Sequence, residues 1–424
     1  MQYILAFLIA ILSIILSSFL LPKYSIARIF SIIWGMQVVL IYLLFGHLLV
    51  FYGYGLLYIS IMCMFFTFGE FIGKKSCLNY VSNLNFKYIF RERTSLFFLK
   101  ILIFLSFLSV INGIYKTGFS VFEIVSLEGL LQLNDTASEL RYSGVQTNSV
   151  VDSILRVFLY IPAAYGGFVY PFLSRKKRYM TWITLLPPLL ITFTQNTKLG
   201  FITSVFFWLS GYWIAGYSYG MPFMKISIKS FLKILLGGFV FLFLLFISMI
   251  LRTGRIDNEI IQVIERKFIN YSVSHLSAFD IWYSTNNVVN YSFGIKTFYG
   301  ISNAIGLVNR EQGVFTDFVT CGNRYNNDIR TNVYSVFRFL IEDYATLGSI
   351  LFIFFLGFIG GVSLCFIKKR ILFNYSQMIA LAVLYFVSVS FATSIFAYSS
   401  YIVTIFFMYL LMKYSFVKQT NMKI

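Results

Sequence analysis

The sequence contains little charge. Only 12% of its 424 residues are Asp, Glu, Lys or Arg, whereas a soluble domain usually carries about 25%. Apolar residues make up 58% of the chain. They form runs that recur along its length, and each run approaches the roughly 20 residues that cross about 30 Å of hydrocarbon. These properties argue against a soluble protein and predict a polytopic membrane protein that contacts the lipid bilayer.

Cysteine and histidine are also scarce, with four cysteines and two histidines. We place Cys63 and Cys365 within spans, Cys77 in the cytoplasm and Cys321 in an outer loop. A single outer cysteine cannot form a disulfide across the outer loops, and no group of residues has the spacing of a metal site. We therefore predict that the protein uses no metal and no cofactor.

The apolar runs are too long for barrel strands, which have about 10 residues and alternate in polarity. In hydrocarbon every backbone amide must be paired internally, so charge-free runs of this length predict helices. We predict an all-α protein with about 11 transmembrane helices (10–12). The predicted spans are roughly 2–21, 29–51, 54–73, 95–112, 153–173, 180–196, 199–217, 231–251, 346–367, 371–391 and 395–412.

The net charge of +18 would suit a nucleic-acid partner, but the position of the charge argues against one. Loops on one side of the predicted spans hold most of the basic residues, with only Glu70 and Glu92 as acids. On the other side acids and bases nearly balance. Basic loops face the cytoplasm, so we predict an outer N-terminus, an inner C-terminus and no nucleic-acid partner. The first apolar run has no basic residue before it, which predicts a retained span rather than a signal peptide.

Five segments follow from this topology. They are the N-terminal transmembrane helices (1–112), a first outer loop (113–152), central transmembrane helices (153–251), a large outer loop (252–345) and C-terminal transmembrane helices (346–424). The large loop is rich in Tyr, Phe and Ile, which is not the composition of a disordered segment. Apolar residues recur there at helical spacing and predict an amphipathic helix: Ile260, Ile264, Phe268, Tyr271, His275 and Phe279.

Cations on the outer side are the first candidates for function. Arg252 and Arg255 directly follow the eighth predicted span, and their guanidinium groups suit phosphate oxygens. Arg141 ends the smaller outer loop, and Lys198 lies in a short outer turn. Each cation also has an interpretation without function. Arg252 and Arg255 could anchor the chain to lipid headgroups, and Arg141 could be a solvated surface charge. Lys198 could extend its ammonium group to the membrane surface, as snorkelling lysines do.

The tract 309–344 combines arginines, carboxylates, amides and aromatic rings, the side chains that bind sugar hydroxyls and sugar faces. Its candidate sugar-binding residues are Arg324, Arg330, Asn332, Tyr334 and Arg338. The alternative is a salt-bridged loop, because Arg338 and Glu342 are four residues apart and can pair on a helix.

Other residues have structural interpretations beside functional ones. His275 is the histidine of the large outer loop, and it is either a packing residue on the apolar face of a helix or a general base. His47 is interpreted as a polar residue in helix packing. Gly357 and Gly361 form a GxxxG pattern, which predicts close helix packing and indicates no activity.

The layout resembles the bacterial oligosaccharide repeat-unit polymerases, the Wzy-type O-antigen polymerases. The resemblance covers most of the chain. The number of spans, a medium outer loop, a large outer loop late in the sequence and an aromatic, low-charge composition all match. The local matches are Leu140-Arg141-Tyr142 with Gly144, the turn from Thr194 to Lys198, Arg252, Thr331-Asn332-Val333-Tyr334, Asp343-Tyr344 and Gly348. One departure is Lys198, where arginine is expected, so the charge remains and the bidentate geometry is lost.

The resemblance implies a metal-independent glycosyltransferase of the helical GT-C type in the bacterial inner membrane, with its N-terminus periplasmic and its C-terminus cytoplasmic. Donor and acceptor would be undecaprenyl-pyrophosphate-linked oligosaccharides, and a chain-length regulator is a candidate partner. The pyrophosphate would bind to Arg252, Arg255, Arg141 and Lys198. The catalytic base would be His275, Asp343 or Glu342.

Two other functions stay open from the sequence. A lipid-linked oligosaccharide flippase would need polar groups through the bilayer centre, and the predicted spans contain almost no buried charge. An O-antigen ligase would use the same donor and differ in its acceptor. A purely structural membrane protein would leave the large, aromatic and charged outer loop without a purpose.

Overall fold

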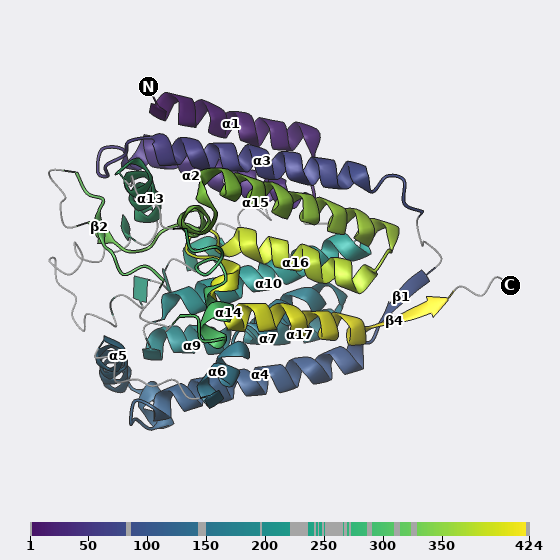
Figure 1. The fold of residues 1–424 in the computed structure, drawn as a ribbon. Coiled ribbons are helices and arrows are strands. Elements are labelled where there is room, and N and C mark those ends of the chain that lie inside the picture. Colours follow the sequence, from purple (N-terminus) through teal and green to yellow (C-terminus); the bar gives the residue numbers. More distant parts are fainter. Residues whose placement is uncertain are drawn as a thin grey trace. The chain divides into compact units, whose positions relative to one another are not determined.

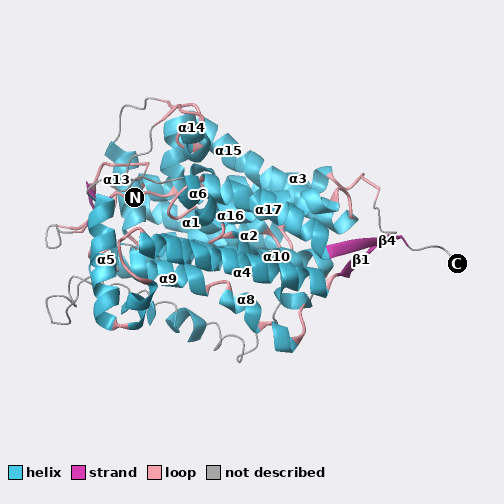
Figure 2. Cartoon of the chain, turned by 90° about the horizontal axis from the view of Figure 1, so that it is seen from below, coloured by secondary structure: helices cyan, strands magenta, loops and turns pink. Residues whose placement is uncertain are grey.

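The structure, a computed structural model, is mostly helical (Figure 2). It describes residues 2–81, 86–142, 150–195, 197–220, 236–240, 243–244, 246–247, 250, 266, 269–270, 273–285, 291–308, 314–323 and 329–420. Within these residues, 7 helices are long and apolar enough to cross a membrane. They are Gln2–Leu20, Ile26–Phe45, Tyr54–Ser76, Glu92–Tyr115, Val150–Phe172, Lys198–Tyr219 and Val336–Lys369. The prediction of an all-α polytopic membrane protein is confirmed at this level.

The chain forms two compact units. Unit 1 consists of Met1–Phe86 and Arg266–Ile402, and unit 2 consists of Lys87–Glu265 and Val403–Ile424. Unit 1 is therefore built from two stretches of chain that are far apart in the sequence.

The long helices in the described part of unit 1 are α1 (Gln2–Leu20), α2 (Ile26–Phe45), α3 (Tyr54–Ser76), α15 (Val336–Lys369) and α16 (Phe373–Val389). In Figure 1, α3 packs against α1, α2 and α15, and α15 also packs against α16. The shorter elements of unit 1 are α13 (Ser274–Thr285), which contacts α3 and α15, α14 (Tyr299–Ala304), β2 (Val319–Thr320) and β3 (Arg330–Thr331).

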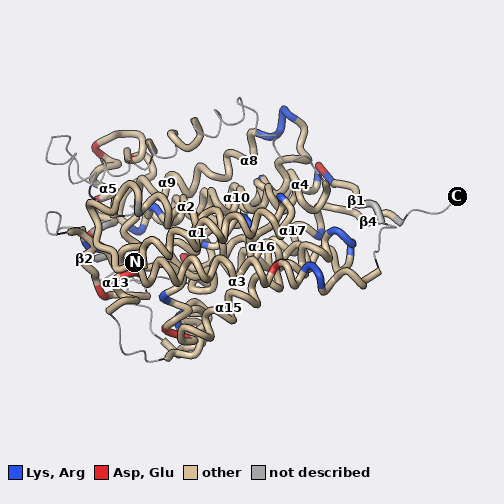
Figure 3. The backbone as a smooth tube through the Cα atoms, turned by 90° about the horizontal axis from the view of Figure 1, so that it is seen from above, with Lys and Arg blue, Asp and Glu red and all other residues tan. Residues whose placement is uncertain are grey.

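Glycines bring α3 and α15 into backbone contact. A Cβ atom at Gly69 of α3 would overlap the carbonyl oxygen of Phe354, and one at Gly361 of α15 would overlap that of Glu70. The GxxxG pattern of Gly357 and Gly361 thus meets a matching pattern in α3. The prediction of close helix packing is confirmed. The last turns of both helices carry lysines, seen as blue segments in Figure 3.

Asp280 of α13 forms hydrogen bonds with the start of α3. Its buried carboxylate accepts hydrogen bonds from the backbone N–H groups of Gly53 (2.8 Å) and Gly55 (2.6 Å). Two neighbouring amides, those of Tyr52 and Leu56, donate to it as well. The first N–H groups of a helix have no partner within the helix, so this carboxylate satisfies them and complements the helix dipole.

Unit 2 contains α4 (Glu92–Tyr115), α5 (Leu127–Tyr142), α6 (Val150–Val157), α7 (Ile161–Val169), α8 (Tyr179–Ile183), α9 (Leu186–Gln195) and α10 (Lys198–Tyr219). The predicted span 180–196 is divided between α8 and α9. Pro187 and Pro188 lie in the first turn of α9, where the missing N–H groups cost nothing. A two-stranded sheet of β1 (Phe86–Phe90) and β4 (Phe416–Thr420) completes the unit.

Several predicted segments fall largely outside the described residues. These are the eighth span (231–251) and most of the amphipathic helix that begins at Ile260. The end of that helix is described, because His275 and Phe279 lie in α13 and are both buried. The last predicted span (395–412) corresponds to α17 (Ser399–Ser415).

Candidate functional site at the kink of helix α15

Helix α15 is interrupted at Ala345, whose backbone has φ 57° and ψ 177°. Side chains with a Cβ atom rarely adopt this conformation, and holding it costs about 1–3 kcal/mol. Residues before the kink lie in the predicted outer loop, and residues after it form the apolar part of the helix. Strained backbone conformations of this kind cluster at functional sites.

A loop from Tyr291 to Thr297 is clamped onto the kink. The backbone N–H of Ser292 donates to the carbonyl oxygen of Glu342 at 2.9 Å, which satisfies a carbonyl near the kink. The Asp343 carboxylate accepts from the Ser292 hydroxyl at 2.5 Å, and from the backbone N–H groups of Lys296 (3.1 Å) and Thr297 (2.5 Å). Asp343, predicted as a candidate base, is 1% exposed and serves here to hold the loop.

A charged cluster lies one turn before the kink, and we define it as Lys296, Asp317, Arg338 and Glu342. The guanidinium of Arg338 donates to Glu342 Oε1 at 2.7 Å and to Asp317 Oδ2 at 2.8 Å. The ammonium of Lys296 pairs with the other carboxylate oxygen of Glu342. Two cations and two anions thus neutralise one another in a partly buried network.

Aromatic rings enclose the guanidinium of Arg338. Its central carbon lies 4.0 Å from the ring centroids of both Phe315 and Tyr334, and 5.0 Å from Trp282. A guanidinium over aromatic faces is held by cation–π attraction in addition to its hydrogen bonds. Arg338 is only 7% exposed, so the cluster has a fixed geometry.

The pKa values of the cluster follow from burial and charge. Burial lowers the pKa of Lys296, and the neighbouring charge of Arg338 lowers it further. For Asp317, burial raises the pKa, but the hydrogen bond and charge of Arg338 outweigh it, so the pKa is lowered overall. The lowered pKa of Asp317 favours its charged form. The Asp317 side chain is 51% exposed, which leaves a carboxylate of this network open to a ligand.

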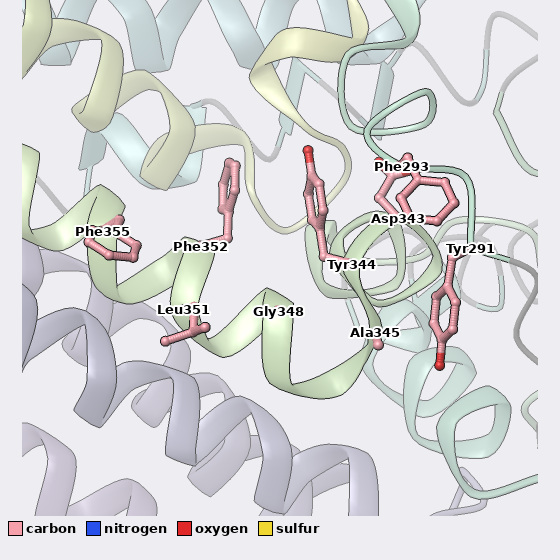
Figure 4. A pocket seen from close by; sticks show the side chains of 9 residues that line it. All are labelled: Tyr291, Phe293, Asp343, Tyr344, Ala345, Gly348, Leu351, Phe352 and Phe355. Carbon is pink, nitrogen blue, oxygen red and sulfur yellow. The ribbon is translucent and has the colours of Figure 1, made fainter.

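A cavity of about 470 Å³ opens beside the kink. Figure 4 shows its lining: Tyr291, Phe293, Asp343, Tyr344, Ala345, Gly348, Leu351, Phe352 and Phe355. The rings of Tyr344 and Phe352 project to the same side of α15 and stack at 5.5 Å. Phe293 has a positive φ of 47° and is 85% exposed. The cavity is thus mainly apolar, and it borders the Asp343 clamp.

The predicted sugar-binding residues are partly brought together. Tyr334 donates its hydroxyl hydrogen bond to Asp317 Oδ2 at 3.0 Å, and the amide of Asn332 donates to the carbonyl oxygen of Phe315 at 3.5 Å. Together with Arg338 they surround the same short stretch of chain. Arg330 is exposed in β3, and Arg324 lies outside the described residues.

His275 lies in a different environment. Its ring is buried between Trp34 and Phe391, at centroid distances of 6.2 and 6.3 Å. Neither ring nitrogen has a hydrogen-bond partner among the described residues, and burial lowers the pKa to about 4. A buried imidazole with so low a pKa suits packing better than proton transfer from a sugar hydroxyl.

The predicted pyrophosphate-binding residues all belong to unit 2, whereas the catalytic and sugar-binding candidates belong to unit 1. Lys198 is the first residue of α10, and Arg141 lies in the last turn of α5 with its side chain outside the described part. Arg252 and Arg255 are also outside the described residues.

Comparison with models of protein families, with curated proteins and with solved structures finds no match for this chain. The resemblance to O-antigen polymerases therefore stays a prediction from layout and local motifs.

Sequence reasoning missed the role of Lys296. Its partner Glu342 is 46 residues away, and no periodicity relates the two positions. Reasoning from the sequence also overlooked an ion pair between Lys116 and Asp152 in unit 2. The presence of Asp152 at the start of an apolar segment was a usable signal, since acids near hydrocarbon are usually paired.

Proposed function

We propose that this chain is a metal-independent membrane glycosyltransferase that polymerises lipid-linked oligosaccharide repeat units into O-antigen or a related surface polysaccharide. Its donor and acceptor are undecaprenyl-pyrophosphate-linked oligosaccharides. In this proposal the chain has about eleven spanning helices in a GT-C-like arrangement. It lies in the bacterial inner membrane, with the reaction on the periplasmic face.

One observation supports the proposal above the others. A polar, aromatic-lined cluster around Arg338 lies on the same helix as an apolar cavity, and the kink at Ala345 separates them. Sugar hydroxyls bind to carboxylates and guanidinium groups, and sugar faces pack on aromatic rings. A hydrocarbon chain suits the cavity. Their combination fits an amphiphile with a saccharide head and a lipid tail.

The proposed reaction transfers a glycan between two such lipids. An acceptor hydroxyl oxygen forms a bond to the anomeric carbon of the donor, and the bond from that carbon to the diphosphate oxygen breaks. The diphosphate leaves with the electron pair, and the hydroxyl proton passes to a carboxylate and then to solvent. Arg252, Arg255, Arg141 and Lys198 are proposed to neutralise the leaving group.

Among the carboxylates of unit 1, Asp317 is the proposed proton acceptor. Its side chain is half exposed, whereas Asp343 is occupied by the loop and Glu342 contacts two cations. Its low pKa keeps it ionised, so it accepts the proton late, when bond formation has made the hydroxyl acidic. Loss of a general base typically lowers a rate about 10²–10⁴-fold.

The decisive experiment is polymerisation of lipid-linked repeats by the purified protein with EDTA present. We expect Asp317→Asn to insert normally and to lose at least about 100-fold in rate. Asp343→Asn is the matched control, because it weakens the loop clamp and should lower protein abundance along with activity. Full polymerisation by Asp317→Asn would contradict its role as the base.

Deletion of the gene in cells separates the proposal from its alternatives. A polymerase defect leaves lipopolysaccharide with a single capped repeat. Loss of all repeats would instead indicate an O-antigen ligase or a flippase and would overturn the proposal.

A further inference from the structure

Unit 1 carries an exposed apolar segment, which we define as residues 293–307 and which includes α14. Its residues 297–307 contain no Asp, Glu, Lys or Arg, although they fall within the predicted large outer loop. The apolar side chains of Phe293, Ile301, Ile305 and Leu307 are between 43% and 85% exposed. Exposed apolar patches of this kind mark contact with a protein or a membrane.

Backbone donors of this segment are paired within it. The N–H groups of Phe298, Ile301, Ile305 and Leu307 donate at 2.9–3.0 Å to carbonyl oxygens inside the segment. The hydroxyl of Ser302 donates to the carbonyl oxygen of Phe298 at 3.2 Å. An unpaired backbone amide is costly in hydrocarbon, where no water can bond to it. These donors are paired without water, as contact with hydrocarbon requires.

The other side of the segment is fixed at the start of an apolar helix. The ring of Phe298 stacks on that of Phe396 at a centroid distance of 5.0 Å. A Cβ atom at Gly300 would lie 2.5 Å from the backbone nitrogen of Ser399, the first residue of α17. Since α17 corresponds to the last predicted span, its first residue lies where a span meets the membrane surface. The segment is held at that level.

The cavity beside the kink borders the same apolar surface. Phe293 forms part of its wall, and Leu351 and Phe355 of α15 line it as well (Figure 4). Leu347, Leu351, Phe355 and Ile359 follow one another at four-residue spacing, so they share one face of α15, and all four are exposed. In a helix that spans the membrane, an exposed apolar face contacts lipid. Exposed apolar groups from both the segment and this face therefore border the cavity.

We propose that residues 293–307 contact the hydrocarbon of the bilayer leaflet nearest the kink, and that the cavity opens sideways into that leaflet. The occupant of this surface is lipid, because Lys296, the single charged residue of the segment, is paired with Glu342, and because the surface continues into the exposed face of α15. Interfacial segments reach about 5–10 Å into the boundary between headgroups and acyl chains. A hydrocarbon tail can then enter the cavity without leaving the membrane. That this tail belongs to a lipid-linked oligosaccharide rests on the proposed function.

The test measures lipid contact by spin labelling of single introduced cysteines in the full-length protein, reconstituted in liposomes. Oxygen concentrates in hydrocarbon and a neutral nickel chelate stays in water, so the ratio of their collision rates with the label reports its surroundings. Ile305→Cys is the test position, and Leu351→Cys is the reference for lipid. Phe318→Cys is the matched control in water, because Phe318 is 66% exposed and Ile305 65%, and Phe318 adjoins the exposed carboxylate of Asp317. The wild type, whose native cysteines are buried or half-buried, gives the background signal.

We expect the oxygen-to-nickel ratio at Ile305 to equal that at Leu351 and to exceed that at Phe318. A ratio at Ile305 as low as that at Phe318 would place the segment in water and overturn the proposal. Exclusion of both reagents at Ile305 would show that protein covers the segment, and would also overturn it. Dipolar broadening of the spectrum would then identify the cover as a second copy of the chain.

A second arm tests entry into the cavity. Benzoylphenylalanine replaces Phe352, which lines the cavity, or Phe97, which is exposed on α4, and the protein is irradiated in liposomes that contain a polyprenyl phosphate. We expect more cross-linking of prenyl lipid at position 352 than at position 97, and equal cross-linking would reject entry.

Neither arm requires catalysis, so the two proposals can fail separately. Lipid contact at Ile305 in a protein that does not polymerise lipid-linked repeats would leave this surface standing and reject only the proposed function. Polymerisation by a protein whose Ile305 label lies in water would reject only the surface.

Discussion

Acidification should destabilise this protein through His275. The imidazole is buried with a pKa of about 4, whereas an unfolded histidine has a pKa of about 6.5. The native state therefore holds the neutral ring, and the unfolded state takes up a proton as the pH falls. The stability that the neutral ring contributes is complete above pH 6.5 and is lost progressively as the pH falls towards 4.

The expected loss can be worked out from these two pKa values. The full difference corresponds to about 3 kcal/mol at 1.36 kcal/mol per pKa unit. At pH 5 the unfolded ring is almost fully protonated and the native ring is not, so about 2 kcal/mol is already lost. The free energy of unfolding should be measured by SDS titration in mild detergent, at pH 8 and at pH 5.

His275→Met is the matched control, because methionine is unbranched, fills a similar volume and does not titrate. Subtracting its pH dependence removes the contributions of carboxylates elsewhere in the chain. If the free energy of unfolding depends on pH in the same way for the wild type and His275→Met, the imidazole has the same pKa in the native and unfolded states. The interpretation of His275 as a buried packing residue would then be wrong. Full polymerising activity of His275→Met would at the same time exclude the histidine as the base.

Four other predictions test separate features. Cys77 follows α3, Cys365 lies in α15, and Cys365 is among the causes that raise the pKa of the Cys77 thiol, so mild oxidation with copper phenanthroline should link the two thiols and change mobility on a non-reducing gel; two free thiols would contradict their proximity. Gly69→Val should abolish stable folding, seen as loss of membrane protein on a blot, because the new side chain would overlap a carbonyl of α15. Asp280→Asn should lower the free energy of unfolding by about 1–3 kcal/mol through weaker bonds to the start of α3, and an unchanged value would remove its role as a cap. Arg252→Ala should lower polymerisation about 10²–10³-fold at normal abundance if it binds the leaving diphosphate, whereas Arg252→Lys should retain part of the rate.

Much of the helical layout could be predicted from the sequence because apolar runs and glycine spacing are local signals. The predicted spans 2–21, 54–73 and 346–367 each correspond to a long apolar helix, and the last of these helices begins ten residues earlier than predicted, at Val336. The pattern of Gly357 and Gly361 predicted close packing, and the structure supplies the partner helix. The pairing of Arg338 with Glu342 was also predictable as an alternative, since four residues separate them.

The candidate site could be predicted less well from the sequence than the helices. Alanine is a good helix former, so nothing at Ala345 predicts a kink, and the loop that bonds to the neighbouring Asp343 lies about 50 residues earlier in the sequence. Lys296 and Glu342 are similarly far apart in the sequence, so no local pattern predicts their contact. Asp343 was a candidate catalytic base by residue type and position, but its hydrogen-bond partners are set by tertiary structure alone.

The division of unit 1 into two distant stretches has a consequence for biogenesis. Helix α3 leaves the ribosome long before α15, its partner, and the intervening chain contains most of unit 2. At roughly 5–20 residues per second this delay lasts tens of seconds. During that time the glycine face of α3 at Gly69 and Gly73 is open in the bilayer, where such faces associate readily with other helices. Until α15 is inserted, this glycine face of α3 therefore lacks the partner helix that covers it in the folded protein.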